Sequence, residues 1–116
     1  MSNAPHTIAE LPQFIRDCAD AGVTEDEKVA IIDGVAADPM QGDEVQGSGG
    51  VRKVRFAGRG KGKSGGYRVI TAYFGPHAPT YLLALLSKGD RANFTRAEVA
   101  AFKALTTAID RFWKGR

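Results

Sequence analysis

The sequence predicts one α+β domain, in which an N-terminal strand and a helical hairpin pack on an antiparallel sheet that carries a C-terminal helix. The 116 residues, 43% hydrophobic and 25% charged, have the size and composition of a single globular domain. Helix-start patterns stand near both ends of the chain, and strand-like segments with short connections stand between them, which favours an antiparallel sheet with segregated helices. We expect one domain over residues 1–116, with residues 1–6 flexible.

The first elements are predicted to be an edge strand and a helix. Residues 6–11 form a short apolar–polar mixture that suits one edge strand. Pro12 is tolerated in the first turn of the following helix, and Gly22 is placed to end that helix in a left-handed conformation. Phe14 and Cys18 fall at helical spacing, so we interpret Cys18 as a small core residue rather than a reactive thiol.

A second helix is predicted to begin at Thr24. Thr24 and Glu27 form a capping box, in which each side chain accepts from the backbone N–H of the other residue. The predicted buried stripe comprises Val29, Ile32 and Ala36, with Ile31 and Val35 beside them. Asp38-Pro39 ends the helix, because the residue before a proline avoids the helical region. Two helices joined by a short turn predict an antiparallel pair.

Three strands are predicted after a polar, glycine-rich connection. Residues 51–56 alternate, so that Lys53 and Arg55 share one face of their strand. Residues 67–74 are rich in β-branched and aromatic side chains, which favours a second strand. Residues 81–86 are apolar on both faces, which is typical of a buried central strand.

The last helix is predicted to begin at a second capping box, Thr95 to Glu98. Its buried face is expected to contain Val99, Phe102, Leu105 or Thr106, Ile109, and Trp113 or Phe112. The basic residues at its end suit the negative end of the helix dipole.

Charge is divided unequally along the chain. Residues 1–46 contain two cations and ten acids, whereas residues 47–116 contain fourteen cations and three acids. Seven cations and no acid lie between Val51 and Arg68: Arg52, Lys53, Arg55, Arg59, Lys61, Lys63 and Arg68. Such a concentration of like charge predicts a polyanionic partner, with nucleic acid as the leading candidate.

Residues 57–64, AGRGKGKS, satisfy a loose nucleotide-binding pattern that we reject. A phosphate-binding loop of that kind is followed by a helix, whose N-terminus binds the phosphates. Here two glycines and a strand-like segment follow. The glycines suit instead a hairpin loop that lets Arg59, Lys61 and Lys63 approach a phosphate backbone.

The composition also indicates a cellular location. No apolar run approaches the roughly 20 residues that span a bilayer, and the start lacks the pattern of a signal peptide. A single cysteine excludes an internal disulfide and a cysteine-rich zinc site, and it fits a reducing compartment. We therefore expect a soluble, cytoplasmic protein.

Three stretches of the chain resemble a toxin of the RelE superfamily: GGVRKVRFAGRGKGKSGGYRVITAYF at 49–74, YLLALLSKGD at 81–90 and FTRAE at 94–98. The resemblance extends from about Thr7 to the final helix and favours the HigB-like branch of type II toxin–antitoxin modules. It implies a small RelE-like fold and a ribosome-dependent mRNA interferase that inhibits translation. The implied partners are messenger RNA at the 30S A site and a small antitoxin of helix-turn-helix type.

The resemblance implies a cleavage chemistry that uses no metal and no cofactor, in which the 2′-hydroxyl attacks the adjacent phosphate. The positions that match the family's catalytic residues are Lys53, Arg55, Arg68 and Lys88. The residues expected to bind RNA are Arg52, Arg59, Lys61, Lys63 and Arg91. An arginine grips two phosphate oxygens in its planar fork, and a lysine crowded by cations has a lowered pKa that brings it nearer to acid–base duty.

The chain departs from the family pattern at the proton donor. RelE has a further arginine where this chain has Gly89, and a tyrosine near the position of Phe94. The histidines of the HigB site are missing, since His6 and His77 stand elsewhere. The candidates for general acid and base are Lys53, Lys61, Lys63 and Lys88.

Two other functions remain open on this sequence. The same fold supports ParE-like inhibitors of DNA gyrase, and the missing tyrosine and histidines permit a non-catalytic RNA- or ribosome-binding module. Structural roles are also open: Arg68 is a possible ion-pair partner for an acid of the helical half, and Lys53 and Arg55 would discourage aggregation at a sheet edge.

Overall fold

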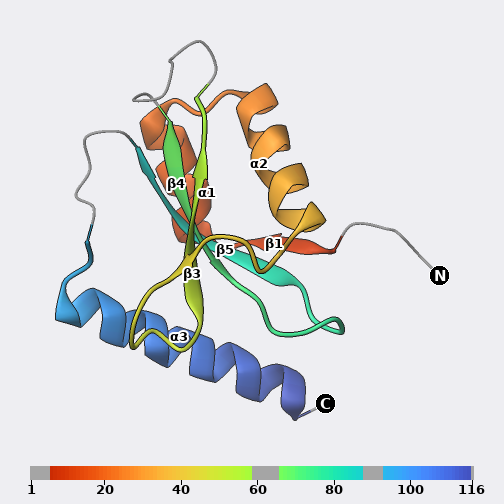
Figure 1. Ribbon diagram of the computed structural model, residues 1–116, viewed down its shortest axis with the longest axis vertical. Helices are drawn as coiled ribbons and strands as arrows, with labels where there is room; N and C mark the ends of the chain where they lie inside the picture. Colours follow the sequence, from red (N-terminus) through yellow and green to blue (C-terminus); the bar gives the residue numbers. More distant parts are fainter. Residues whose placement is uncertain (1–5, 59–65, 88–92, 116) are drawn as a thin grey trace.

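The computed structural model describes residues 6–58, 66–87 and 93–115. In these residues the chain forms a five-stranded sheet of order β1-β5-β4-β3-β2 and three helices (Figure 1). The elements are β1 (Ile8–Glu10), α1 (Pro12–Ala21), α2 (Glu25–Ala37), β2 (Asp43–Glu44), β3 (Val51–Phe56), β4 (Tyr67–Ala72), β5 (Thr80–Ser87) and α3 (Arg96–Lys114). The α+β class is confirmed. No helix in the described ranges combines the length and apolar character that a bilayer span requires.

The sheet is mixed rather than wholly antiparallel. Strands β3, β4 and β5 pair antiparallel as expected, and β2 adds to β3 in the antiparallel sense, but β1 pairs parallel with β5. Between β1 and β5 the chain forms the helical hairpin and then strands β2, β3 and β4, so the two paired strands are far apart in sequence. Strand β2, which lies within the glycine-rich connection, was not expected. Strand β5 is an interior strand, as its apolar sequence predicts, and β4 lies in the middle of the sheet.

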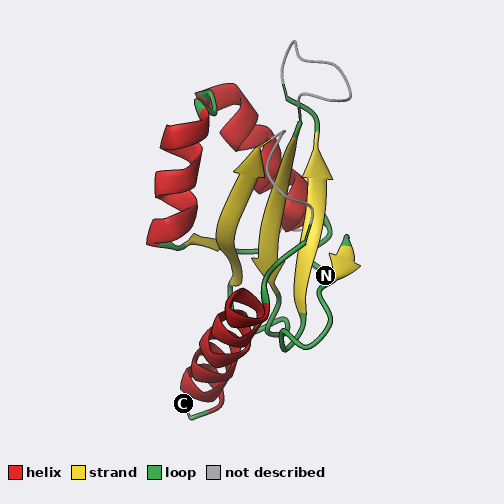
Figure 2. Cartoon of the chain, turned by 90° about the vertical axis from the view of Figure 1, so that its left-hand side faces the viewer, coloured by secondary structure: helices red, strands yellow, loops and turns green. Residues whose placement is uncertain are grey.

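Alternation along the strands gives the sheet two different faces. Phe56, Tyr67 and Val69 join a core with α1 and α2, whereas Val51 and Ile70 join a second cluster that α3 contacts. Figure 2 shows α3 extending below the sheet, apart from α1 and α2. We call these the helical-layer face and the α3 face.

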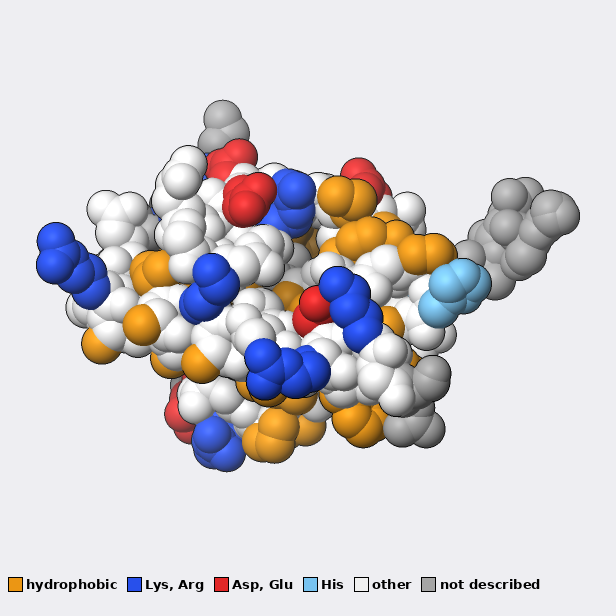
Figure 3. Space-filling model, turned by 90° about the horizontal axis from the view of Figure 1, so that it is seen from below, with side chains coloured by type: hydrophobic (Ala, Val, Ile, Leu, Met, Phe, Trp, Pro, Cys, Tyr) orange, Lys and Arg blue, Asp and Glu red, His pale blue; other side chains and the backbone are white. Residues whose placement is uncertain are grey.

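Helix α3 covers only part of its face. Val99 and Phe102 pack on the second cluster, Thr106 is buried, and Trp113 Nε1 donates to Tyr81 Oη at 3.0 Å. These contacts resolve the two alternatives left by the sequence in favour of Thr106 and Trp113. Leu105 and Phe112 are exposed instead, Phe112 by 55%. Seen from below, this side of the molecule carries lysine and arginine side chains among hydrophobic ones (Figure 3).

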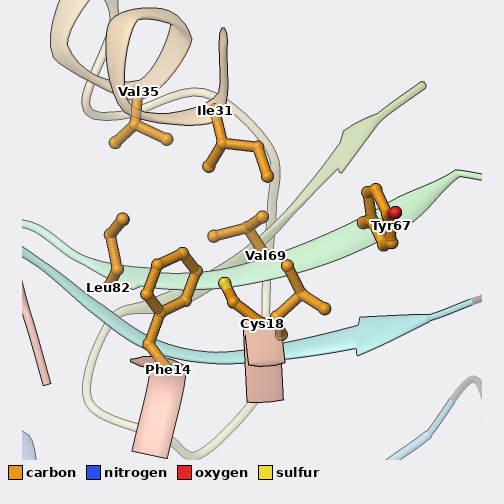
Figure 4. Close-up of a cluster of buried hydrophobic side chains, with 8 residues drawn as sticks. Phe14, Cys18, Ile31, Val35, Tyr67, Val69 and Leu82 are labelled. Atoms are coloured by element: carbon orange, nitrogen blue, oxygen red, sulfur yellow. The ribbon is translucent and has the colours of Figure 1, made fainter. Parts of the chain in front are cut away.

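The helical-layer core closes the other face. Phe14 and Cys18 from α1 meet Ile31 and Val35 from α2 over the β-strand residue Val69 (Figure 4). Burial raises the pKa of the Cys18 thiol, which disfavours its nucleophilic thiolate and supports its interpretation as a core residue.

One polar contact closes the open part of the β5 edge. β1 pairs with β5 only from Thr80 to Leu82. Further along, Asp17 of α1 accepts the backbone N–H of Leu85 through Oδ2 at 2.9 Å. The carboxylate satisfies a strand-edge donor where no neighbouring strand reaches it.

Candidate functional site

Two arginines lie directly opposite each other on β3 and β4. The antiparallel register pairs Arg55 with Arg68 and Lys53 with Ile70. Directly opposed residues have Cβ atoms about 4.5–5.5 Å apart, so the two arginine side chains start from one small patch of the sheet. Arg55 is exposed and Arg68 is half-buried.

Lys53, Arg55 and Arg68 all project from the α3 face. Lys53 and Arg55 lie two and four residues after Val51, so their side chains point to the same face of β3 as that of Val51. Arg68 lies two residues before Ile70 and shares its face of β4. Val51 and Ile70 belong to the cluster that α3 contacts. Helix α3 crosses the sheet near the start of β3, so the arginines lie toward the opposite end of this face (Figure 1). We call Lys53, Arg55 and Arg68 the cationic patch.

The electrostatics of the arginine pair favour an anion. Within residues 6–58, 66–87 and 93–115, neither Arg55 nor Arg68 forms an ion pair or a hydrogen bond through its side chain. The expected structural role of Arg68 as the partner of an acid therefore has no support in the described part of the chain. Like charges directly opposite each other across a ladder destabilise a sheet. An anion such as a phosphate would remove that cost.

Arg52 lies apart from the cationic patch. Its side chain points to the other face of β3, and its Nη1 donates to the carbonyl oxygen of Gly42 at 3.0 Å. The structure therefore separates Arg52 from Lys53 and Arg55, as alternation along the strand predicts.

Five of the predicted site residues lie outside the described residues. They are Arg59, Lys61, Lys63, Lys88 and Arg91. Their described neighbours in sequence are informative, because Phe56, Tyr67 and Ser87 are aligned across β3, β4 and β5. The β3–β4 connection and the segment after β5 thus both leave the sheet at the end where Arg55 and Arg68 lie.

A buried network holds the start of β4. Tyr67 Oη donates to Glu27 Oε1 at 3.0 Å, and the same oxygen accepts the backbone N–H of Thr24 at 2.9 Å. Glu27 is buried, so this capping box at the start of α2 also anchors the residue that precedes Arg68. The sequence showed the capping box but gave no signal that Tyr67 would join it. Tyr67 is only 3% exposed, which excludes it as a base-stacking platform.

Gly66 fixes the return of the chain beside the arginine pair. A Cβ at this position would collide with the backbone carbonyl oxygen of Phe56. Only glycine allows the two backbones to approach so closely just before Arg68 enters the ladder. A strand rather than a helix follows, which agrees with the rejection of the nucleotide-binding pattern at residues 57–64.

The two histidines lie toward the other end of the sheet. His6 Nε2 is 2.7 Å from the carbonyl oxygen of Ala78, and His77 is exposed in the turn before β5. Arg68, by contrast, is paired with Leu86 near the end of β5. The histidines therefore do not contribute to the cationic patch. In the described ranges no three His, Cys, Asp or Glu side chains gather as metal ligands.

A family model described as the RelE toxin of the RelE / RelB toxin–antitoxin system matches residues 14–114. The chain belongs to the RelE toxin family. The match runs from α1 through α3 and includes the whole cationic patch. This protein is therefore the toxin of a toxin–antitoxin module, which implies a cognate antitoxin.

The fold agrees with this membership. The chain is similar to the Escherichia coli toxin RelE, solved in the free state as a double arginine-to-alanine mutant, with a TM-score of 0.54. The two chains are 12% identical, and the alignment covers 88% of this chain and 97% of the other. At that identity the likeness shows the RelE fold alone. Membership of the HigB-like branch stays a prediction.

Proposed function

We propose that this toxin is an mRNA interferase, which cleaves messenger RNA on the translating ribosome in the cytoplasm. The observation that carries the proposal is the pair Arg55 and Arg68, opposed across β3 and β4 without an acidic partner among the described residues. Two planar guanidinium groups at neighbouring ladder positions suit the oxygens of one phosphate. Membership of the RelE family supports this assignment.

The chemistry proposed is an internal transfer within the RNA. The 2′-hydroxyl loses its proton and its oxygen bonds to the adjacent phosphorus, while the bond from phosphorus to the 5′-oxygen breaks. The 5′-oxygen takes up a proton and leaves as a hydroxyl, and the other product carries a 2′,3′-cyclic phosphate. Arg55 and Arg68 stabilise the extra charge on the five-coordinate phosphorus.

Lysines are the proposed agents of proton transfer. Lys53 lies two residues from Arg55 on the same face of β3. Lys88 follows the last residue of β5, and Lys61 and Lys63 belong to the β3–β4 connection. A lysine can take up a proton in its neutral form and donate one in its protonated form, so it can serve as a general base or a general acid. Arg59 and Arg91 are proposed to hold the RNA backbone.

The test is induction in a bacterial host followed by mapping of transcript 5′ ends. The wild-type protein should produce new ends at fixed positions within codons, and Arg68→Ala should remove them. Arg52→Ala is the matched control, because the Arg52 side chain points to the other face of β3. This variant should reduce cleavage less than Arg68→Ala. Purified protein should cut a transcript loaded on ribosomes and leave the free transcript intact.

Other results would reject this function. Intact transcripts together with DNA breaks would identify a gyrase inhibitor, and intact transcripts with stalled translation would identify a binding module without cleavage. Equal cutting by wild type and Arg68→Ala would remove the arginine pair from the mechanism. The proposed antitoxin is a small helix-turn-helix protein encoded beside the toxin.

A further inference from the structure

A groove lies between α3 and the turn that connects β2 to β3. Its volume is about 520 Å³. Phe94, Val99 and Ala100 contribute its apolar lining, Gln46 forms part of the turn side, and Arg96 and Lys103 stand on α3 beside it. None of its described lining residues is among those assigned to RNA cleavage.

The walls of the groove are held by specific contacts. Thr106 Oγ1 donates toward the carbonyl oxygen of Ser48 at 3.2 Å, which ties the turn to the helix. A Cβ at Gly49 would meet Thr106 Oγ1, so a glycine there lets the turn approach α3. On the other side, Phe94 packs edge-to-face on Phe102 with ring centroids 5.0 Å apart. The groove is thus an ordered feature of the fold.

The positive charge beside the groove favours an acidic partner. Arg96 and Lys103 are exposed and two turns apart on α3, so they lie on one side of the helix. No acid is found among the lining residues that the structure describes. Further along the same helix, Arg111 and Lys114 are also exposed. A two-fold contact of this face with the same face of a second copy would therefore bring like charges together. An apolar lining beside two cations is complementary to an apolar side chain that is flanked by carboxylates.

We propose that this groove docks an acidic segment of the cognate antitoxin, with an apolar side chain inserted between α3 and the β2–β3 turn. The inference rests on the chain's being the toxin of a toxin–antitoxin module and is independent of how the toxin acts. The groove shares the α3 face with the cationic patch, since Phe94 and Val99 pack on the cluster that contains Val51 and Ile70. A segment anchored in the groove is placed to continue toward the patch.

The test introduces a charge into the groove without disturbing the core. Ala100 is an exposed helical residue that lines the groove, and Ala101 is its exposed neighbour, which does not. The two substitutions Ala100→Glu and Ala101→Glu therefore change charge and helix propensity equally. The probe is the purified product of the gene adjacent to the toxin gene, titrated calorimetrically against each full-length variant.

Ala100→Glu should weaken antitoxin binding by at least about tenfold, because it opposes the partner's carboxylates at the centre of the contact. Ala100→Lys should bind better than Ala100→Glu, and Ala101→Glu should bind like the wild type. All three variants should keep wild-type toxicity when produced without the antitoxin. Wild-type affinity of Ala100→Glu, or an equal loss in Ala101→Glu, would overturn the proposal, as would reduced toxicity of Ala100→Glu with antitoxin binding unchanged. A non-toxic wild-type chain would reject the proposed cleavage function and leave this binding result intact.

Discussion

The two faces of the sheet differ in how they treat polar groups. On the helical-layer face, the buried Glu27 carboxylate accepts from Tyr67 and Thr24, and the half-buried Asp17 carboxylate accepts from the backbone of Leu85. On the α3 face, Arg55 and Arg68 oppose each other, and α3 covers only one end of the strands. The first face is built for stability, and the second retains an electrostatic cost that suits the binding of an anion.

Substitution of Phe14 should have the largest effect on the helical-layer face. Phe14 is fully buried in the core between α1, α2 and the sheet. Phe14→Ala should lower the free energy of unfolding by about 3–5 kcal/mol through lost burial and the cavity left behind. Denaturant unfolding measures the loss. Phe112→Ala, at an aromatic residue that is 55% exposed, is the control and should change stability by much less.

Substitution of Arg68 on the α3 face should lower the cleavage rate without lowering stability, unlike the substitution of Phe14. Arg68→Ala should lower the rate of RNA cleavage by about 10²–10³-fold, the size expected for one donor that stabilises transition-state charge. Its free energy of unfolding should stay the same or rise by up to about 1 kcal/mol, because the repulsion from Arg55 is relieved. Single-turnover cleavage and thermal unfolding measure the two effects. A strongly destabilised Arg68→Ala would show that the arginine serves the fold.

Substitution of Tyr67 tests whether the hydrogen bonds on the helical-layer face also position Arg68 on the α3 face. Tyr67→Phe removes one hydrogen bond to Glu27 and should cost about 1–2 kcal/mol of stability. Because the side chain anchors the residue before Arg68, the variant should also cleave more slowly at temperatures well below its melting point. Tyr73→Phe is the matched control. Its hydroxyl makes no hydrogen bond within the described residues, and neither quantity should change.

The smallest effect should come from the ion pair between β1 and α2. Lys28 Nζ lies 2.7 Å from Glu10 Oε1, and this hydrogen bond raises the pKa of Lys28 above its ordinary value of 10.5. A raised pKa means that the pair stabilises the fold fully below pH 10.5 and loses that effect as the pH rises through the folded-state value.

Glu10→Gln tests this pH dependence. It should cost less than about 1 kcal/mol near neutral pH, as is usual for an ion pair that water reaches. The difference from the wild type should shrink above pH 10.5. Urea unfolding at several pH values measures it, and a difference that grew with pH would contradict the assignment.

Local signals in the sequence were sufficient for much of the fold. Both capping boxes formed at Thr24 and Thr95, and Gly22 ended α1 with a φ of 71°. Alternation also placed Lys53 and Arg55 on the same face. Each of these features depends on residues within a few positions of one another, so the chain itself carries the information.

Features that depend on distant residues were not predictable in the same way. Val29 was expected in the buried stripe of α2 and is 49% exposed, whereas Glu27 is buried. Glu27 can be buried because Tyr67, which is distant in sequence, donates a hydrogen bond to its carboxylate. Nor does local pattern predict that β1 pairs parallel with β5, or that Arg55 stands opposite Arg68, since strand register depends on the whole sheet.

The opposed arginines couple binding to folding. Any ligand that binds only the native protein stabilises it by RT ln(1 + [L]/Kd). An anion held between Arg55 and Arg68 would relieve a repulsion that the unfolded chain does not have. The melting temperature of this toxin is therefore itself a titration signal, and it should rise with phosphate or short RNA in the wild type and stay level in Arg68→Ala.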